Sequence, residues 1–337
     1  MGRPDTQRLT KANPDQSGGN DMLEQFQRDG YILVPGVFSA EEMDAALEAM
    51  ERNFYGKSYA SWLEDFERGE QGTVGDGFTT KQDEVVGRSQ FPVGEPALDR
   101  LIENERYLDL FDLFLGDRPS YCNAHLFMRS GPVDERYPDE SWSGYHVDHN
   151  TNCVLPPSED AGRFSYINSG VYLHDVEDDG APMLLVPGSH TRAAEVFAEG
   201  WDTGNMASVS HVRDIRKAGL QDPVPAVGTK GTAAFYSSYL LHSAQPFQDK
   251  KKQRAFWTLS MCRRDADRFT RFSNPFIYGE REYMLPFITD TTPRVRSLFG
   301  WPEPGDPYYT EQTLGLLARA FPGIDLDPYR QALHRAS

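Results

Sequence analysis

Apolar and polar positions in the first third of the chain predict a helix, a strand and further helices. From Asp21 the segment MLEQFQRDG has helical spacing and ends at Gly30, and the apolar run YILVPG follows as a short strand. Ser39 precedes AEEMDAALEAMERNF, whose first turn is acidic, as at a capped helix start. The stretch from Pro96 to Leu115 also has helical spacing. We expect these elements to pack around a core.

The pattern changes between Tyr121 and Met261. Short β-branched or aromatic segments such as YCNAHLFM, INSGVYLHDV, TAAFY and RAFWTLSM are separated by Pro, Gly, Asp and Asn. Many short strands without long helices between them predict an antiparallel sandwich or barrel. Beyond Pro286 the spacing is helical again. We predict one mainly β domain over residues 21–337, with its β core at about 121–262 and helical packaging at 21–115 and 286–335.

Three segments have the composition of tails or loops. Residues 1–20 carry almost no large apolar side chains and cannot offset their ordering entropy, so we predict a disordered tail. Residues 57–97 and 195–225 are irregular and rich in Gly, Pro, Trp and acidic residues. We predict that they form lids over a site.

Composition and charge narrow the classes of partner. The 337 residues carry a net charge of −17, which repels nucleic acid. The three cysteines cannot all pair and show no close metal spacing, and no apolar run is long enough for a membrane helix or signal core. We expect a cytoplasmic monomer or homodimer with no nucleic acid or membrane partner.

One histidine cluster has the spacing of metal ligands. In GYHVDHN, His146 and Asp148 are two residues apart, so on a strand both side chains share one face. Two histidines and one carboxylate on one face of an octahedron form the metal site of non-haem Fe(II) oxygenases. The third ligand must come from elsewhere in the chain. The alternative is a strand-end His and Asp that bond only to turn backbone.

Other catalytic motifs are missing from the sequence. Metallo-hydrolases of the β-lactamase fold carry His-x-His-x-Asp-His, and Asp148-His149 matches its end, but Gly144 occupies its first position. We therefore expect His149 to be no ligand of a dinuclear zinc site. No GxGxxG, Walker or G-x-S-x-G elbow motif is present in a suitable context.

Several ordered segments together resemble the phytanoyl-CoA dioxygenase family of Fe(II)/2-oxoglutarate-dependent oxygenases. They are EQFQRDGYILVPGVFSAEEM, HVDHN, APMLLVPGSH, GTAAFYSSYLLHSAQPF and RAFWTLSM, and they cover roughly residues 22–262. The resemblance implies a double-stranded β-helix core, as in jelly rolls and cupins, with flanking α-helices. It also implies that Fe(II), 2-oxoglutarate and O2 are needed.

The resemblance assigns roles to individual residues. It implies that His146, Asp148 and His242 bind the iron and that Arg254 grips the distal carboxylate of 2-oxoglutarate, for which a guanidinium fork is suited. Asp148 argues against the related halogenases, which have Gly or Ala there. Ser143 and Asn168 are further candidate contacts to 2-oxoglutarate. His190 is expected to fix a turn rather than to bind metal.

Alternation along YCNAHLFMR predicts a pocket. Cys122, Ala124, Leu126 and Met128 share one face, which has the composition of a core. The other face begins with Tyr121 and continues with mixed polar and aromatic residues, as a ligand cavity needs. The predicted substrate-binding residues on it are Asn123, His125, Phe127 and Arg129. The alternative is an outward, solvated face.

The resemblance implies hydroxylation of a small molecule, such as a natural product, coupled to decarboxylation of 2-oxoglutarate to succinate. Desaturation, epimerisation and cyclisation use the same metal ligands, so they remain alternatives. A non-catalytic jelly-roll binding protein is a further alternative.

Overall fold

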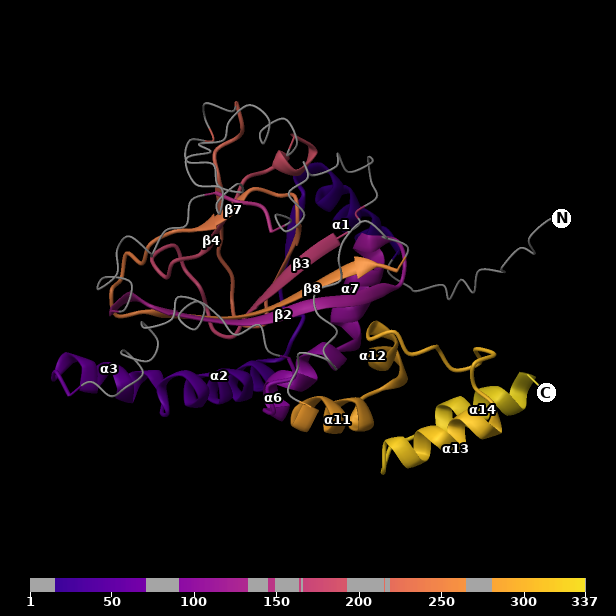
Figure 1. The fold of residues 1–337 in the computed structure, drawn as a ribbon. Helices are drawn as coiled ribbons and strands as arrows, with labels where there is room; N and C mark the ends of the chain where they lie inside the picture. Colours follow the sequence, from indigo (N-terminus) through magenta and orange to yellow (C-terminus); the bar gives the residue numbers. More distant parts are fainter. Residues whose placement is uncertain are drawn as a thin grey trace, which may run out of the picture.

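The computed structural model describes residues 16–70, 91–132, 145–148, 164, 166–192, 215, 219–264 and 281–336. Two facing β-sheets with helices around them make up this part of the chain (Figure 1). The strands are β1 (Tyr31–Val34), β2 (Pro119–Ser130), β3 (Tyr166–Tyr172), β4 (Met183–Leu185), β5 (Val224–Ala226), β6 (Ala233–Ser237), β7 (His242–Ala244) and β8 (Gln253–Arg263). The helices are α1 (Gln16–Asp29), α2 (Ala40–Tyr55), α3 (Tyr59–Glu67), α6 (Pro96–Asp99), η1 (Arg100–Glu103), α7 (Glu105–Leu115), η2 (Ser189–Arg192), α11 (Arg281–Asp290), α12 (Pro293–Leu298), α13 (Glu311–Ala320) and α14 (Asp327–Ala336).

The strand order confirms the predicted fold class. The larger sheet has the order β1-β6-β3-β8-β2 and the smaller sheet β5-β4-β7, and all strand pairs are antiparallel. Strands that are adjacent in a sheet are mostly not adjacent in the sequence, because the chain crosses between the sheets. The result is a mainly β, double-stranded β-helix core with flanking helices.

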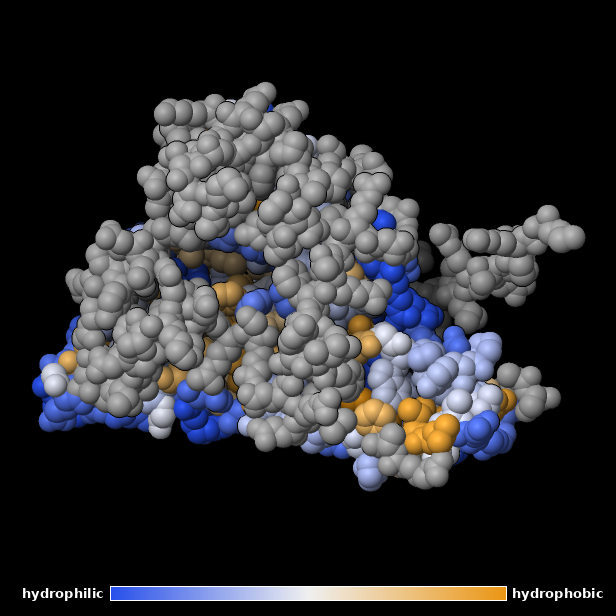
Figure 2. Space-filling model, viewed as in Figure 1, coloured by the Kyte–Doolittle hydropathy of each residue, from blue (hydrophilic) through white to orange (hydrophobic). Residues whose placement is uncertain are grey.

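One face of the larger sheet packs against helices. Alternate residues of β8, from Ala255 to Met261, share a core with apolar residues of α2 and α7. In Figure 1, α2, α6 and α11 lie on one side of the larger sheet, and β4 and β7 lie on the other. Helix α2 buries Met43, Ala46 and Phe54 toward this core, whereas the lower edge of the molecule, along α2 and α3, is hydrophilic in Figure 2. The opposite face of the sheet is therefore the interior of the barrel.

A β-bulge in β2 changes the predicted alternation at its first residues. Tyr121 pairs with Met261 and Asn123 pairs with Ser260, so Cys122 is the extra residue between them. Tyr121 consequently packs on the helix side of the sheet, whereas Cys122 lies with Tyr166 and Cys262. The predicted sides of Tyr121 and Cys122 are wrong, because the bulge reverses the alternation. From Asn123 to Met128 burial alternates as predicted, and Arg129 and Ser130 are both buried.

Most predicted helices are present, with some differences in their limits. Ser39 caps α2 through a capping box with Glu42, as expected. Helix α1 begins at Gln16, so the predicted tail is wrong for its last five residues, and residues 1–15 lie outside the described part of the chain. The predicted irregular segment 57–97 contains α3, because Ser58 caps it and its aromatic side chains, including the buried Trp62, pack into the core.

The helices after the β core begin earlier than predicted. Pro286 lies inside α11, which starts at Arg281. Helices α13 and α14 form a separate small core around Tyr309 and Tyr329. Arg296, which is buried, joins them to α11: it donates hydrogen bonds to the carbonyl oxygens of Ile288 and Thr289 and to that of Asp325, just before α14. Within the described residues, no helix has the length and apolar character required to cross a membrane.

Candidate metal centre

His146 and His242 are brought together by backbone pairing. They form an isolated antiparallel bridge in which each backbone N–H donates to the other's carbonyl oxygen at 2.9 Å. Directly paired residues project their side chains to the same side, and the two imidazole ring centroids are 4.3 Å apart. A strand was expected around His146 and Asp148. In the described residues 145–148 the pairing is limited to this bridge, and the partner strand β7 has three residues.

His146 and Asp148 lie on one side of the backbone, as predicted, and their neighbours lie on the other side. Tyr145 and Val147 are buried in an apolar cluster with Leu241. Asp148 follows on the same side as His146, and its backbone N–H donates to the carbonyl oxygen of Ser238 at 3.1 Å. The Asp148 Oδ1 atom lies 3.7 Å from His146 Nε2 and 3.4 Å from His242 Nε2.

The three side chains fit a metal ion. One ligand atom from each of His146, Asp148 and His242 lies within 4.8 Å of the other two. Ligand atoms about 2.1 Å from an ion and at right angles lie about 3 Å apart, close to the separations in this cluster. His242 Nδ1 lies 3.0 Å from the carbonyl oxygen of Leu240. Donation of the Nδ1 proton to that oxygen leaves Nε2 as the electron-pair donor facing Asp148.

Electrostatics keep the Asp148 carboxylate ionised, as metal binding requires. Burial alone raises the pKa of Asp148, but attraction to His242, His146 and His125 outweighs it and holds that pKa well below its usual range. Burial lowers the pKa of His242, and the neighbouring Asp148 carboxylate reverses this, so the net shift is upward and a metal ion at this imidazole competes with a proton. A carboxylate that stays ionised beside two imidazoles is a ready set of donors for a divalent cation.

The second oxygen of Asp148 is held by neighbouring strands. Asn168 Nδ2 donates to Asp148 Oδ2 at 2.6 Å, and the Tyr236 hydroxyl donates to the same oxygen at 3.3 Å. Ser260 Oγ donates to Asn168 Oδ1 at 2.5 Å. The predicted role of Asn168 in binding 2-oxoglutarate remains a prediction, and the contact observed is with Asp148. The part played by Tyr236 was missed, since only the strand register brings it to Asp148.

Two arginines mark the other end of the barrel interior. Arg254 on β8 is directly paired with Arg129 on β2, and both are buried. Arg254 Nη1 donates to the carbonyl oxygen of Ala181 at 2.7 Å, and its guanidinium lies 5.7 Å from the ring centroid of Phe256. Arg129 Nη1 donates to the carbonyl oxygen of Gln245 at 3.4 Å. Paired residues share a face, so this end of the interior carries two neighbouring positive charges.

The predicted substrate-binding residues lie on the same interior face. Asn123, His125 and Phe127 are half-buried on β2, and His125 is close enough to Asp148 for the carboxylate to affect its pKa. Burial lowers the pKa of His125 and outweighs the opposing effect of Asp148. His125 is therefore neutral near pH 7 and can both donate and accept hydrogen bonds.

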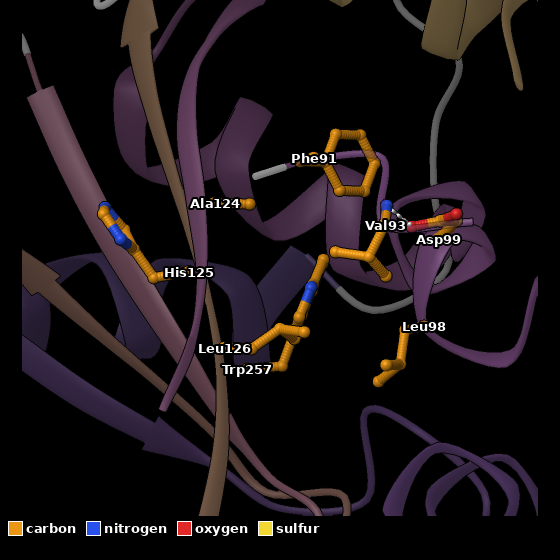
Figure 3. A pocket seen from close by; sticks show the side chains of 8 residues that line it. All are labelled: Phe91, Val93, Leu98, Asp99, Ala124, His125, Leu126 and Trp257. Atoms are coloured by element: carbon orange, nitrogen blue, oxygen red, sulfur yellow. Dashed lines mark hydrogen bonds between the residues drawn. The ribbon is translucent and has the colours of Figure 1, made fainter. Parts of the chain in front are cut away.

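A crevice on the other side of β2 is separate from this interior. Phe91, Val93, Asp99 and Trp257 line it, and Figure 3 shows the His125 side chain pointing away from them. The crevice is too narrow to admit a water molecule. The Asp99 carboxylate accepts hydrogen bonds from the backbone N–H groups of Val93 and Gly94, each at 2.8 Å. We interpret the crevice as a packing irregularity beneath the sheet.

Several predicted site residues fall outside the described residues. Ser143 and most of the predicted lids are among them, and so is His149, which was expected not to bind metal. His190 is described: it is buried in η2, and its Nε2 lies 3.2 Å from the carbonyl oxygen of Gln27 in α1. It therefore links this turn to the N-terminal helix, away from the metal ligands, in keeping with its predicted structural role.

Comparisons with known proteins agree with this site. The chain is 24% identical over 173 residues to the ectoine dioxygenase of Stutzerimonas stutzeri (strain A1501), covering 50% of each chain. It is 25% identical over 182 residues to that of Bordetella bronchiseptica, covering 53% of this chain and 52% of the relative. The chain thus matches only about half the length of these curated relatives.

Two solved structures share the fold. One is EctD from S. alaskensis with 2-oxoglutarate and 5-hydroxyectoine, with a TM-score of 0.52, 18% identity and coverage of 82% of this chain and 86% of that chain. The other is the epimerase SnoN with Fe3+, alpha ketoglutarate and nogalamycin RO, with a TM-score of 0.50, 18% identity and coverage of 74% of this chain and 85% of that chain.

The family model for phytanoyl-CoA dioxygenase matches residues 26–255, well over half of the chain. This range contains all three residues of the metal-ligand cluster and ends just after Arg254. The chain therefore belongs to the phytanoyl-CoA dioxygenase family.

Proposed function

We propose that this protein is an Fe(II)/2-oxoglutarate-dependent oxygenase that oxidises a small molecule. The observation that carries the proposal is the cluster of His146, Asp148 and His242, whose donor atoms converge within 4.8 Å. Two imidazoles and one carboxylate on one face of an ion leave three positions for exogenous ligands. Family membership and the likeness to folds that bind iron and 2-oxoglutarate support the same function.

We propose that the two cofactors are bound by residues at opposite ends of the barrel interior. His146, Asp148 and His242 would hold the iron, and Arg254 would hold the distal carboxylate of 2-oxoglutarate with a bidentate fork. Iron and 2-oxoglutarate together would supply the oxidising chemistry, in which O2 is consumed and 2-oxoglutarate is decarboxylated to succinate. The hydrogen bond to Ala181 and the ring of Phe256 orient the Arg254 guanidinium before the anion binds.

Gly170 leaves room for the ring of Phe256 in the interior near Arg254. A Cβ atom at Gly170 would lie 1.7 Å from Cζ of Phe256, so the ring occupies the space where any other residue would project. Gly170 is paired with Thr258 on β8, and Asn168 lies on the same face of β3. We propose that this row of side chains lines the passage between the metal ligands and Arg254.

The proposed substrate is a small molecule that contacts the β2 side of the interior. His125, neutral because of burial, and Asn123 offer hydrogen bonds, and Phe127 offers an apolar surface. Arg129 adds a positive charge beside Arg254. Hydroxylation is the proposed outcome. Asp148, a carboxylate ligand that the related halogenases lack, argues against halogenation, whereas desaturation, epimerisation and cyclisation share the same metal ligands.

The test is succinate formation by the purified protein with Fe(II), 2-oxoglutarate and a panel of small molecules that includes ectoine. We expect a substrate to stimulate succinate formation and Asp148→Ala to abolish it. Asp44→Ala is the matched control, because Asp44 is exposed on α2 and pairs with Lys230. Equal turnover by Asp148→Ala and the wild type would contradict the proposal.

Mass spectrometry of the product separates the possible outcomes. One added oxygen atom supports hydroxylation. Loss of two hydrogens indicates desaturation or cyclisation, and an unchanged mass indicates epimerisation. Stoichiometric Fe(II) binding with no turnover across the panel would favour a binding protein instead.

A further inference from the structure

The two oxygens of Asp148 have different surroundings. Oδ1 faces the Nε2 atoms of His146 and His242, at 3.7 and 3.4 Å. Oδ2 accepts hydrogen bonds from Asn168 Nδ2 at 2.6 Å and from the Tyr236 hydroxyl at 3.3 Å. An ion beside both imidazoles therefore meets Oδ1, while Oδ2 is already used by two donors.

The donors are themselves fixed by strand register. Asn168 on β3 is paired with Tyr236 on β6 and with Ser260 on β8, so the three residues form one row across adjacent strands. The Ser260 hydroxyl donates to Asn168 Oδ1, and the amide therefore directs its N–H groups to Asp148. All three residues are buried. Rotation of the carboxylate would break its hydrogen bonds to two buried donors, Asn168 and Tyr236, which is costly.

We propose that Asn168 and Tyr236 are positioning residues that hold Asp148 to one-oxygen coordination of the metal. This inference rests on the proposed function and adds to it. If Asp148 bound through both oxygens, it would take one of the three positions that 2-oxoglutarate and O2 need. The two donors keep that position free by engaging Oδ2. Ser260 acts one step further away, by orienting Asn168.

The test is Co2+ binding by the purified protein, followed by the visible absorption of the bound ion and by competition with a chelator. Hydrogen-bond partners of metal ligands typically contribute 10- to 100-fold to metal affinity. We expect Asn168→Ala to weaken Co2+ binding by about 10- to 100-fold. Tyr236→Phe, which removes the longer of the two bonds, should weaken it by up to about 10-fold. Both should alter the Co2+ spectrum, because the carboxylate changes its coordination.

Tyr172→Phe is the matched control. Tyr172 lies on the same face of β3, but its hydroxyl donates to the carbonyl oxygen of Ala226 and not to Asp148. We expect this variant to keep the Co2+ affinity within about 2-fold and the spectrum unchanged. Thermal unfolding of each variant shows that the fold is retained. If Asn168→Ala does not fold, the isosteric Tyr236→Phe still decides the question.

The possible failures are distinguishable. If the wild type and both variants bind Co2+ with the same affinity and spectrum, the positioning role is contradicted and the metal centre stands. If Tyr172→Phe changes both as much as Tyr236→Phe does, the effect is one of general packing, and the positioning role is again contradicted. If the wild type binds no Co2+, the proposed function itself fails, and this inference fails with it.

Discussion

Neighbouring residues on β8 point to opposite faces of the five-stranded sheet, and the strand is buried on both faces. On the helix side lie Ala255, Trp257, Leu259 and Met261, all in the main apolar core. On the interior side the same strand carries Arg254, Phe256, Thr258 and Ser260, which are almost as inaccessible. Burial of polar and charged groups is unfavourable unless they are hydrogen-bonded or bind a ligand. Burial alone therefore does not distinguish an apolar core from a binding site. The presence of polar and charged side chains among residues that are equally buried does.

The first way to sharpen this comparison is to truncate two adjacent buried residues, one on each face. Trp257→Ala removes a large side chain that is 1% exposed, and we expect it to lower the free energy of unfolding by about 3–5 kcal/mol. Thr258→Val keeps the shape but removes a hydroxyl that donates to the carbonyl oxygen of His125 at 3.4 Å. That variant should change the same quantity by no more than about 1.5 kcal/mol. Urea unfolding measures both, and equal losses would show that the faces do not differ.

The second way concerns the charge on the interior face. Arg254→Met should raise the dissociation constant of 2-oxoglutarate by about 10- to 100-fold, because a hydrogen-bonded ion pair with the distal carboxylate is lost. Calorimetry under anaerobic conditions with Fe(II) measures this constant. Arg129→Met should leave the dissociation constant of 2-oxoglutarate within about 2-fold of the wild-type value, because Arg129 is predicted to bind the substrate instead. No change with Arg254→Met would remove this residue from the 2-oxoglutarate site.

The third and smallest effect is a pH dependence of stability that arises away from the metal centre. Burial lowers the pKa of His190, and it also lowers that of His174. Such a histidine binds fewer protons in the folded state than in the unfolded state, so stability falls as the pH drops below the unfolded value of about 6.5. The loss is at most about 1.4 kcal/mol per pH unit for each histidine.

Urea unfolding on either side of pH about 6.5 checks this sign. His190→Gln should make the free energy of unfolding less dependent on pH over the same interval. A steeper dependence in that variant, or stability that rises as the pH falls, would contradict the account.

The sequence predicted the features that local residue patterns mark. Alternating apolar positions and the family motifs predicted most of the strands, the cluster of His146, Asp148 and His242, and the face of Arg254. The bulge at Cys122 was not predictable, because an extra residue leaves no mark in the apolar pattern. The short strands β5 and β7 contain too few residues for a period to show.

Side-chain contacts between strands could not be predicted from the sequence either. Asn168, Tyr236 and Ser260 come from three separate segments, and only the observed register brings them into one row. Local sequence does not specify register when both faces of a strand are buried, because the usual alternation of apolar and polar positions is lost. Helix α3 was missed for a related reason: its aromatic residues are buried by contacts distant in the sequence.

The central claim is that His146, Asp148 and His242, which lie between the smaller sheet and the interior face of the larger sheet, form a metal site. The most direct measurement is equilibrium binding of Fe(II) under anaerobic conditions, with and without 2-oxoglutarate. We predict one Fe(II) per wild-type chain, tighter binding when 2-oxoglutarate is present, and a loss of affinity beyond about 100-fold in His242→Ala, with no change in the exposed-site control His334→Ala. Fe(II) binding by His242→Ala as tight as that of the wild type would contradict the claim.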